Sequence, residues 1–136
     1  MKPVQQTRFG GSERPSEEQG NCLAACVASI FEVPIKQVPE FLDKNWLSVL
    51  TKWCRERDTT PLYFSPVTKD VLFPETYYIL GVKSRTLPNP NNGHAVVAWG
   101  RKVVHDPHPK IPRGDWNDYE AEDATMFLRY WPEATP

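Results

Sequence analysis

The stretch "GNCLAACVASIF", residues 20–31, is apolar on nearly every side from Cys22 onward. A helix without a polar face is normally buried at the centre of a fold. Asn21 is a residue type that favours the position before a helix, and we predict that it is the N-cap. The residues "EVP" (32–34) predict the helix end, because a residue before proline avoids helical backbone angles. We therefore expect a buried helix over residues 22–31.

A second helix and a set of strands follow this segment. Apolar residues at spacings of three and four predict an amphipathic helix from about 45 to 57. Beyond it the apolar period changes to two, which is typical of half-buried strands. The predicted strands are "PLYFS" (61–65), "TYYILGVKSR" (76–85), "GHAVVAWG" (93–100), "KVVHD" (102–106) and "TMFLRYW" (125–131).

The order of these elements predicts the fold class. Two helices followed by strands indicate an α+β fold, with N-terminal helices packed on an antiparallel β-sheet. We expect a single domain over residues 1–136, in which the polar, glycine-rich residues 1–20 form an N-terminal loop or arm. The acidic stretch "DWNDYEAEDAT" (115–125) is predicted to be a solvated loop, in which Trp116 is a residue that can line or plug a cleft.

Composition and charge exclude several classes of partner. The chain has 136 residues and a net charge of -1, so we expect no binding to nucleic acid. No apolar run approaches the roughly 18 residues of a membrane span, and the N-terminus lacks the apolar core of a signal peptide. These features predict a cytoplasmic protein that does not bind membranes. Its three cysteines should therefore be thiols.

Three residues at the ends of predicted elements have the chemistry of a nucleophile and its base. Cys22 begins the buried helix, where the helix dipole and the free N–H groups of the first turn favour a thiolate. His94 begins one strand and Asp106 ends the next. A cysteine nucleophile needs a base, and the base needs a polar partner to orient it. The pattern therefore indicates a Cys-His-Asp triad.

The hairpin that carries His94 and Asp106 tests this hypothesis. With a two-residue turn at Gly100-Arg101 and a regular ladder, Asp106 would point to the face opposite His94. A three-residue turn, or a bulge, would place Asp106 opposite Val96 and on the face of His94. A triad therefore predicts an irregular hairpin.

The motifs "GNCLAACVASIF", "GHAVVAW" and "VVHDPHP" together resemble the papain-like cysteine peptidase superfamily over roughly residues 22 to 108. The likeness is to the compact branch that contains bacteriocin-leader peptidases and similar small phage-encoded proteins. The resemblance implies a papain-like fold and a hydrolase of amide, peptide or isopeptide bonds. Cys22, His94 and Asp106 would be catalytic, the substrate a peptide or protein, and no cofactor or metal would be needed. A phage-encoded member would act in the cytoplasm of a bacterial host.

The superfamily also uses a glutamine side chain to stabilise the oxyanion, and three residues here compete for that role. They are Gln5, Gln6 and Gln19. The spacing usual in the leader peptidases falls on Ser16, which lacks an amide. Gln19 lies only three residues before the cysteine, whereas Gln6 can return across the intervening loop. We prefer Gln6 and leave the other two open.

Two alternatives use the same residues differently. Cys22 and Cys26 lie one helical turn apart, and His105 and His108 flank Asp106, so these four side chains could form a small zinc-binding domain. The chain could also be a papain-like binding module with an idle triad, acting on a host factor if it is phage-encoded. Without such roles, Cys22 would be a buried apolar residue, as we expect Cys26 and Cys54 to be.

Overall fold

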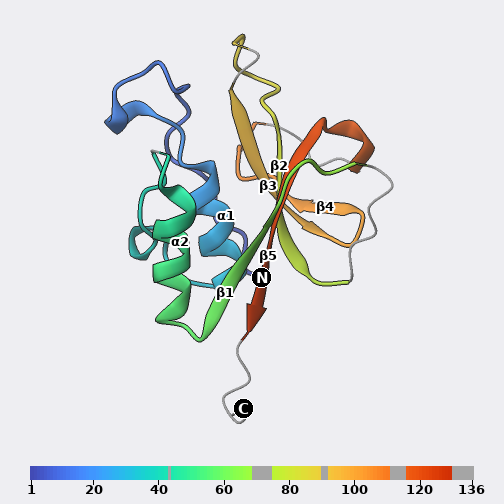
Figure 1. Ribbon diagram of the computed structural model, residues 1–136. Coiled ribbons are helices and arrows are strands. Elements are labelled where there is room, and N and C mark those ends of the chain that lie inside the picture. Colours follow the sequence, from blue (N-terminus) through green and yellow to red (C-terminus); the bar gives the residue numbers. More distant parts are fainter. Residues whose placement is uncertain (43, 69–74, 90–91, 111–115, 130–136) are drawn as a thin grey trace.

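A computed structural model describes residues 1–42, 44–68, 75–89, 92–110 and 116–129 (Figure 1). Two helices precede five strands, as the sequence predicts. The helices and strands are α1 (Cys22–Phe31), α2 (Trp46–Arg55), β1 (Thr59–Phe64), β2 (Tyr77–Lys83), β3 (Gly93–Trp99), β4 (Lys102–His105) and β5 (Ala121–Arg129), with short 3-10 turns η1 (Ser16–Glu18), η2 (Ile35–Gln37) and η3 (Trp116–Asp118). No described helix has the length and apolar character needed to cross a bilayer.

The strands form one antiparallel sheet in the order β1-β5-β2-β3-β4. Both helices pack on the same face of this sheet, α1 against β3 and β2, and α2 against β1 (Figure 1). The predicted α+β class is therefore confirmed. The last two residues of the predicted strand 125–131 lie outside the described residues.

Two apolar clusters hold the layers together, one on each face of the sheet. The cluster under the helices includes Val27 of α1, Leu50 of α2 and Val97 of β3, all fully buried. The opposite cluster includes Tyr78, Val96 and Trp116. Because side chains alternate along a strand, Val96 and Val97 of β3 belong to different clusters. A sheet buried on both faces explains why its central strands are almost wholly apolar.

The acidic stretch 115–125 is not a solvated loop, and this prediction was wrong. Apart from Asp115, which lies outside the described residues, the stretch contains η3 and the first half of β5. Trp116 and Tyr119 are buried in the second cluster, and the Trp116 indole N–H donates to the Tyr78 hydroxyl at 2.9 Å. Trp116 is therefore part of the core and does not plug a cleft. Two buried aromatic residues outweigh the acidic composition around them.

The β3–β4 hairpin has the irregularity that a triad requires. Trp99 pairs with Lys102 across Gly100-Arg101, so the turn has two residues, and Gly100 has a φ of 57°. The register then shifts, because Ala98 pairs with Val103 while Val97 pairs with His105. Val104 is thus an extra residue, which is a β-bulge. The bulge places Asp106 across from Val96, as one of the two predicted alternatives requires.

Residues 1–20 form loops apart from η1, and their first part is anchored to the core. The N–H of Lys2 donates to the Ser29 carbonyl, and the N–H of Val4 donates to the Ser29 hydroxyl at 2.9 Å. The N–H of Gln6 donates to the carbonyl of Pro107 at 2.9 Å. The arm therefore connects the last turn of α1 with the end of β4, and it carries Gln6 into the interior.

Candidate active site

Cys22 is the first residue of α1 and is half-buried. Asn21 holds the N-cap position, as predicted, but its side chain makes no capping bond to the helix. Its Oδ1 instead accepts from the N–H groups of Thr7 and Arg8, at 2.9 and 3.0 Å. Asn21 therefore fastens the N-terminal arm, and the N–H groups of the first helical turn receive no cap from it. Such groups favour negative charge on a nearby sulfur.

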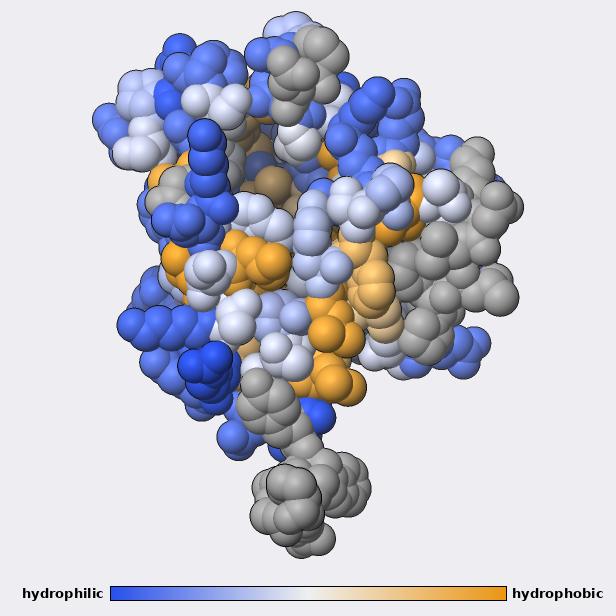
Figure 2. Space-filling view, viewed as in Figure 1, coloured by the Kyte–Doolittle hydropathy of each residue, from blue (hydrophilic) through white to orange (hydrophobic). Residues whose placement is uncertain are grey.

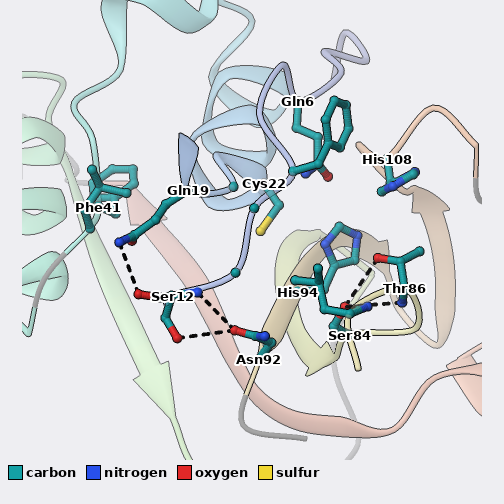
Figure 3. Close-up of a pocket in the computed structure, with 17 residues that line it drawn as sticks. Gln6, Ser12, Gln19, Cys22, Phe41, Ser84, Thr86, Asn92, His94 and His108 are labelled. Atoms are coloured by element: carbon teal, nitrogen blue, oxygen red, sulfur yellow. Dashed lines mark hydrogen bonds between the residues drawn. The ribbon is translucent and has the colours of Figure 1, made fainter. Parts of the chain in front are cut away.

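His94 and Asp106 form a close pair at the end of the sheet. His94 Nε2 lies 2.7 Å from Asp106 Oδ1, and the Asp106 side chain is fully buried while that of His94 is 9% exposed. Since Nε2 bonds the carboxylate, Nδ1 is the ring nitrogen left for the cysteine. The Cys22 sulfur lies beside the His94 ring in Figure 3, and both residues line one cavity. The structure thus brings together the three residues that the sequence selects.

The charge state of His94 follows from its two neighbours. Burial by itself lowers the pKa of an imidazole. Hydrogen bonds with Asp106 and with Cys22, together with the negative charges of both, overcome this effect and raise the pKa of His94 to about 9. At neutral pH the ring therefore carries a proton that it can give to a leaving group.

Two further groups fix the Asp106 carboxylate. The N–H of His108 donates to Oδ1 at 3.0 Å, and the Tyr119 hydroxyl donates to Oδ2 at 3.0 Å. Burial alone would raise the pKa of Asp106, but His94, His108 and Tyr119 together hold it below its ordinary value. Burial and the charge of Asp106 raise the pKa of Tyr119 to about 12, so Tyr119 remains a donor. Sequence reasoning missed Tyr119, because it lies in the stretch predicted to be a solvated loop.

The structure separates the three candidate glutamines. Gln6 is only 6% exposed and lines the cavity that contains Cys22, and its Nε2 donates to the Arg8 carbonyl at 2.9 Å. Its second N–H remains available. Gln19 lines the same cavity, but its amide donates to the carbonyls of Ser12 and Arg14.

The third candidate is exposed. Gln5 lines a different cavity, beside Pro3 and Val104. Gln6 is thus the candidate with both the position and a spare donor.

The other two cysteines are core residues. Cys26 and Cys54 are 0% exposed. Burial raises the pKa of Cys26 well above its ordinary value and that of Cys54 to about 11. Among the described residues, no cluster of three or more His, Cys, Asp or Glu side chains has the geometry of a metal site. The proposed zinc ligand Cys26 lies within the core, while the ring of His105 bonds the Val4 carbonyl at 2.7 Å.

The cavity beside Cys22 has a volume of about 250 Å³. Its walls come from the N-terminal loop on one side and from the β2–β3 connection on the other. Figure 2 shows the surface hollowed between these two regions, near the top of the view. His108, a ligand in the zinc alternative, lines this cavity and packs against Phe9 with ring centroids 5.0 Å apart.

Comparisons of the chain with models of protein families, with curated proteins and with solved structures find no match. The function must therefore be argued from the chemistry of the site.

Proposed function

We propose that this protein is a papain-like cysteine hydrolase that cleaves an amide, peptide or isopeptide bond in a peptide or protein. One observation carries the proposal. Cys22 at a helix N-terminus and His94 line one cavity, and the buried Asp106 bonds His94, so the three side chains form a series. This series supplies a nucleophile, an acid and base, and an orienting carboxylate in the order that covalent catalysis requires.

The first half of the reaction forms a thioester. His94 holds the proton taken from the Cys22 thiol, and the resulting thiolate attacks the carbonyl carbon. A carbon–sulfur bond forms and the carbonyl electron pair moves to oxygen. The N–H of Cys22 and the spare N–H of Gln6 donate to this oxyanion, an interaction typically worth about 3 kcal/mol per donor. When the oxyanion collapses, the carbon–nitrogen bond breaks and His94 gives its proton to the departing amine.

The second half releases the acid. Neutral His94 accepts a proton from water, and the oxygen of that water attacks the thioester carbonyl. The carbon–sulfur bond breaks, and the cysteine leaves as a thiolate beside the imidazolium ion. Asp106 holds the ring by Nε2 throughout, so that Nδ1 faces the sulfur. No residue beyond those described is needed to balance protons or electrons.

Labelling with an electrophile tests the nucleophile. We expect iodoacetamide to modify Cys22 at least about tenfold faster than the same cysteine in the unfolded chain, with Cys26 and Cys54 spared because they are buried. Peptide mapping by mass spectrometry identifies the modified residue. The variant His94→Gln should slow the labelling while circular dichroism reports an intact fold.

Hydrolysis of a peptide library is the companion measurement. Cys22→Ala should lower the rate by more than about 10³-fold without changing the thermal transition. If Cys22 labels no faster than an unfolded thiol, the proposal of an activated nucleophile fails. The idle binding module would then be the better description.

A further inference from the structure

The described lining of the cavity beside Cys22 contains no Asp, Glu, Lys or Arg, and the imidazole of His94 in that lining is already paired with Asp106. Besides Cys22, His94 and His108, its polar side chains are the amides of Gln6, Gln19 and Asn92 and the hydroxyls of Ser12, Ser84 and Thr86. Burying an unpaired charge in such surroundings is costly, whereas burying an amide is cheap when it finds a partner. The volume of about 250 Å³ is below the range typical of whole small-molecule ligands. The cavity therefore suits one uncharged side chain.

Asn92 lines this cavity, and its Nδ2 is a fixed and unused donor buried in the wall. Its Oδ1 accepts from the N–H and the hydroxyl of Ser12, at 3.2 and 3.3 Å. A backbone N–H can only donate, so the amide cannot be turned round and Nδ2 must point away from Ser12. Asn92 is only 6% exposed, and its Nδ2 has no hydrogen-bond partner among the described residues. A buried donor without a partner is unfavourable, and a substrate oxygen that pairs with it removes that cost.

The backbone of Asn92 is held as firmly as its side chain. Its N–H donates to the Asn89 carbonyl, and its own carbonyl accepts from the N–H of Ser84 at 3.0 Å. In Figure 3, Cys22 and His94 lie between Gln6 and Asn92, and the Asn92 nitrogen is turned toward the side of His94 and Ser84. Asn92 thus has the position of a donor to the substrate on the side of the reacting sulfur opposite the proposed oxyanion donor.

We propose that Asn92 determines specificity, and that the substrate carries an uncharged side chain with a carbonyl oxygen, a glutamine or asparagine, beside the scissile bond. The Nδ2 of Asn92 donates to that side-chain oxygen. This inference rests on the proposed function, since it names the group bound next to Cys22. A site built to hydrogen-bond a substrate discriminates strongly against analogues that leave its own polar group unpaired.

Acetylated alanine peptides that end in a fluorogenic anilide test the inference. Each carries Gln, Glu, Lys or Ala at one of the last three positions. At one of these positions the wild-type protein should prefer Gln over Glu and over Lys by at least about tenfold in kcat/KM. Equal rates for all four residues at every position, or a preference for a charged residue, would overturn it.

The variant Asn92→Asp isolates the donor. Aspartate keeps the acceptor for Ser12 but replaces Nδ2 by a second, negatively charged acceptor. We expect kcat/KM for the Gln peptide to fall at least about tenfold and that for the Lys peptide to rise. An unchanged order of preference in this variant would contradict the role of Asn92.

Glu13 offers a matched control for charge near the cavity. The Glu13 carboxylate and the Asn92 amide both lie close to Gly11. A Cβ atom added to Gly11 would be 2.4 Å from Glu13 Oε2 and 2.7 Å from Asn92 Nδ2. Glu13 does not line the cavity. Glu13→Gln should therefore keep the wild-type order of preference. A change equal to that of Asn92→Asp would assign the selectivity to Glu13 and overturn the inference.

A binding measurement separates failure of the inference from failure of the proposed function. With Cys22→Ala, isothermal titration should give a lower Kd for the Gln peptide than for the Glu peptide. Rapid Cys22 labelling without this preference would leave the hydrolase standing and refute the specificity. Slow labelling together with no hydrolysis would refute the hydrolase and, with it, the substrate assignment.

Discussion

At the scale of single residues, the environment of each sulfur decides what each cysteine can do. Cys22 is half-buried at the start of α1 and faces the cavity. Cys26 lies one turn further along, within the core, where burial strongly disfavours its thiolate. Cys54, in α2, is equally enclosed. Because the thiolate is the reactive form, Cys22 is the residue at which nucleophilic chemistry is expected.

His94 should make the stability of the protein depend on pH. Its pKa is raised from 6.5 to about 9, so the folded protein binds this proton more tightly than the unfolded chain does. The resulting stabilisation is complete below pH 6.5 and is lost as the pH rises through about 9. Denaturant unfolding of the wild type and of His94→Gln, measured from pH 6 to 9.5, should show a difference that shrinks across this window. A difference that is constant with pH would contradict the assignment.

Tyr119 should act on the reaction through Asp106. Its hydroxyl donates to Asp106 Oδ2, so Tyr119→Phe removes one of the bonds that hold the pKa of this carboxyl down. We expect the pKa of Asp106 to rise, and the acidic limb of the kcat/KM profile to move to higher pH. The free energy of unfolding should also fall by about 1–3 kcal/mol.

Tyr63→Phe is the matched control for Tyr119→Phe. The Tyr63 hydroxyl donates to Asp123 Oδ2 at 2.9 Å, and neither residue lines the cavity. This variant loses a tyrosine–carboxylate bond of the same kind and should keep the wild-type pH profile. If Tyr119→Phe also keeps that profile, Tyr119 supports the fold without positioning Asp106.

At the scale of elements, two irregularities in the strand pairing of the sheet set the surroundings of Asp106 and of Gly81. The bulge at Val104 turns Asp106 to the face of His94, as described above. A second register shift occurs between Gly81 and Val82 of β2, where Gly81 pairs with Asp123 of β5. The Asp123 carboxylate covers Gly81 so closely that a Cβ there would collide with it. This position therefore requires glycine for reasons of space.

Gly81→Ala should destabilise the protein by about 1–3 kcal/mol, because the added methyl group displaces the Asp123 side chain. Denaturant unfolding of four proteins, the wild type, both single variants and the double variant, measures the effect. In the background Asp123→Ala the carboxylate is gone, so Gly81→Ala should cost distinctly less. Equal costs in the two backgrounds would place the strain elsewhere.

At the scale of the whole molecule, the candidate site lies where three parts of the chain meet. Helix α1 supplies Cys22, the β3–β4 hairpin supplies His94 and Asp106, and the N-terminal arm supplies Gln6. Hydrogen bonds fix the arm to the other two parts, at Ser29 in the last turn of α1 and at Pro107 after β4. The cavity thus depends on contacts between segments about 100 residues apart in sequence.

Local patterns were sufficient for both helices and for the selection of the candidate triad, but the first half of β5 was predicted to be a loop. The ends of α1 follow from the N-cap residue Asn21 and from Pro34, and the class of the fold follows from the apolar periods. Cys22, His94 and Asp106 follow from their places at element ends. The acidic composition of residues 115–125 was misleading, because the burial of Trp116 and Tyr119 depends on partners in β2 and β4 that no local pattern reveals. The side chain of Asn21 likewise bonds a distant arm instead of its own helix.

The sequence by itself determined that a buried helix begins at a cysteine and that an antiparallel sheet follows, because periodicity and helix-end chemistry are local properties. Only the tertiary structure decided which of two hairpin irregularities turns Asp106 toward His94. It also decided which glutamine keeps a spare donor at the cavity beside Cys22, and that Nδ2 of Asn92 is left without a partner. These outcomes depend on strand register and on packing between segments that are distant in sequence. The contacts that favour one arrangement over another join such segments, so a local pattern of residues cannot predict them.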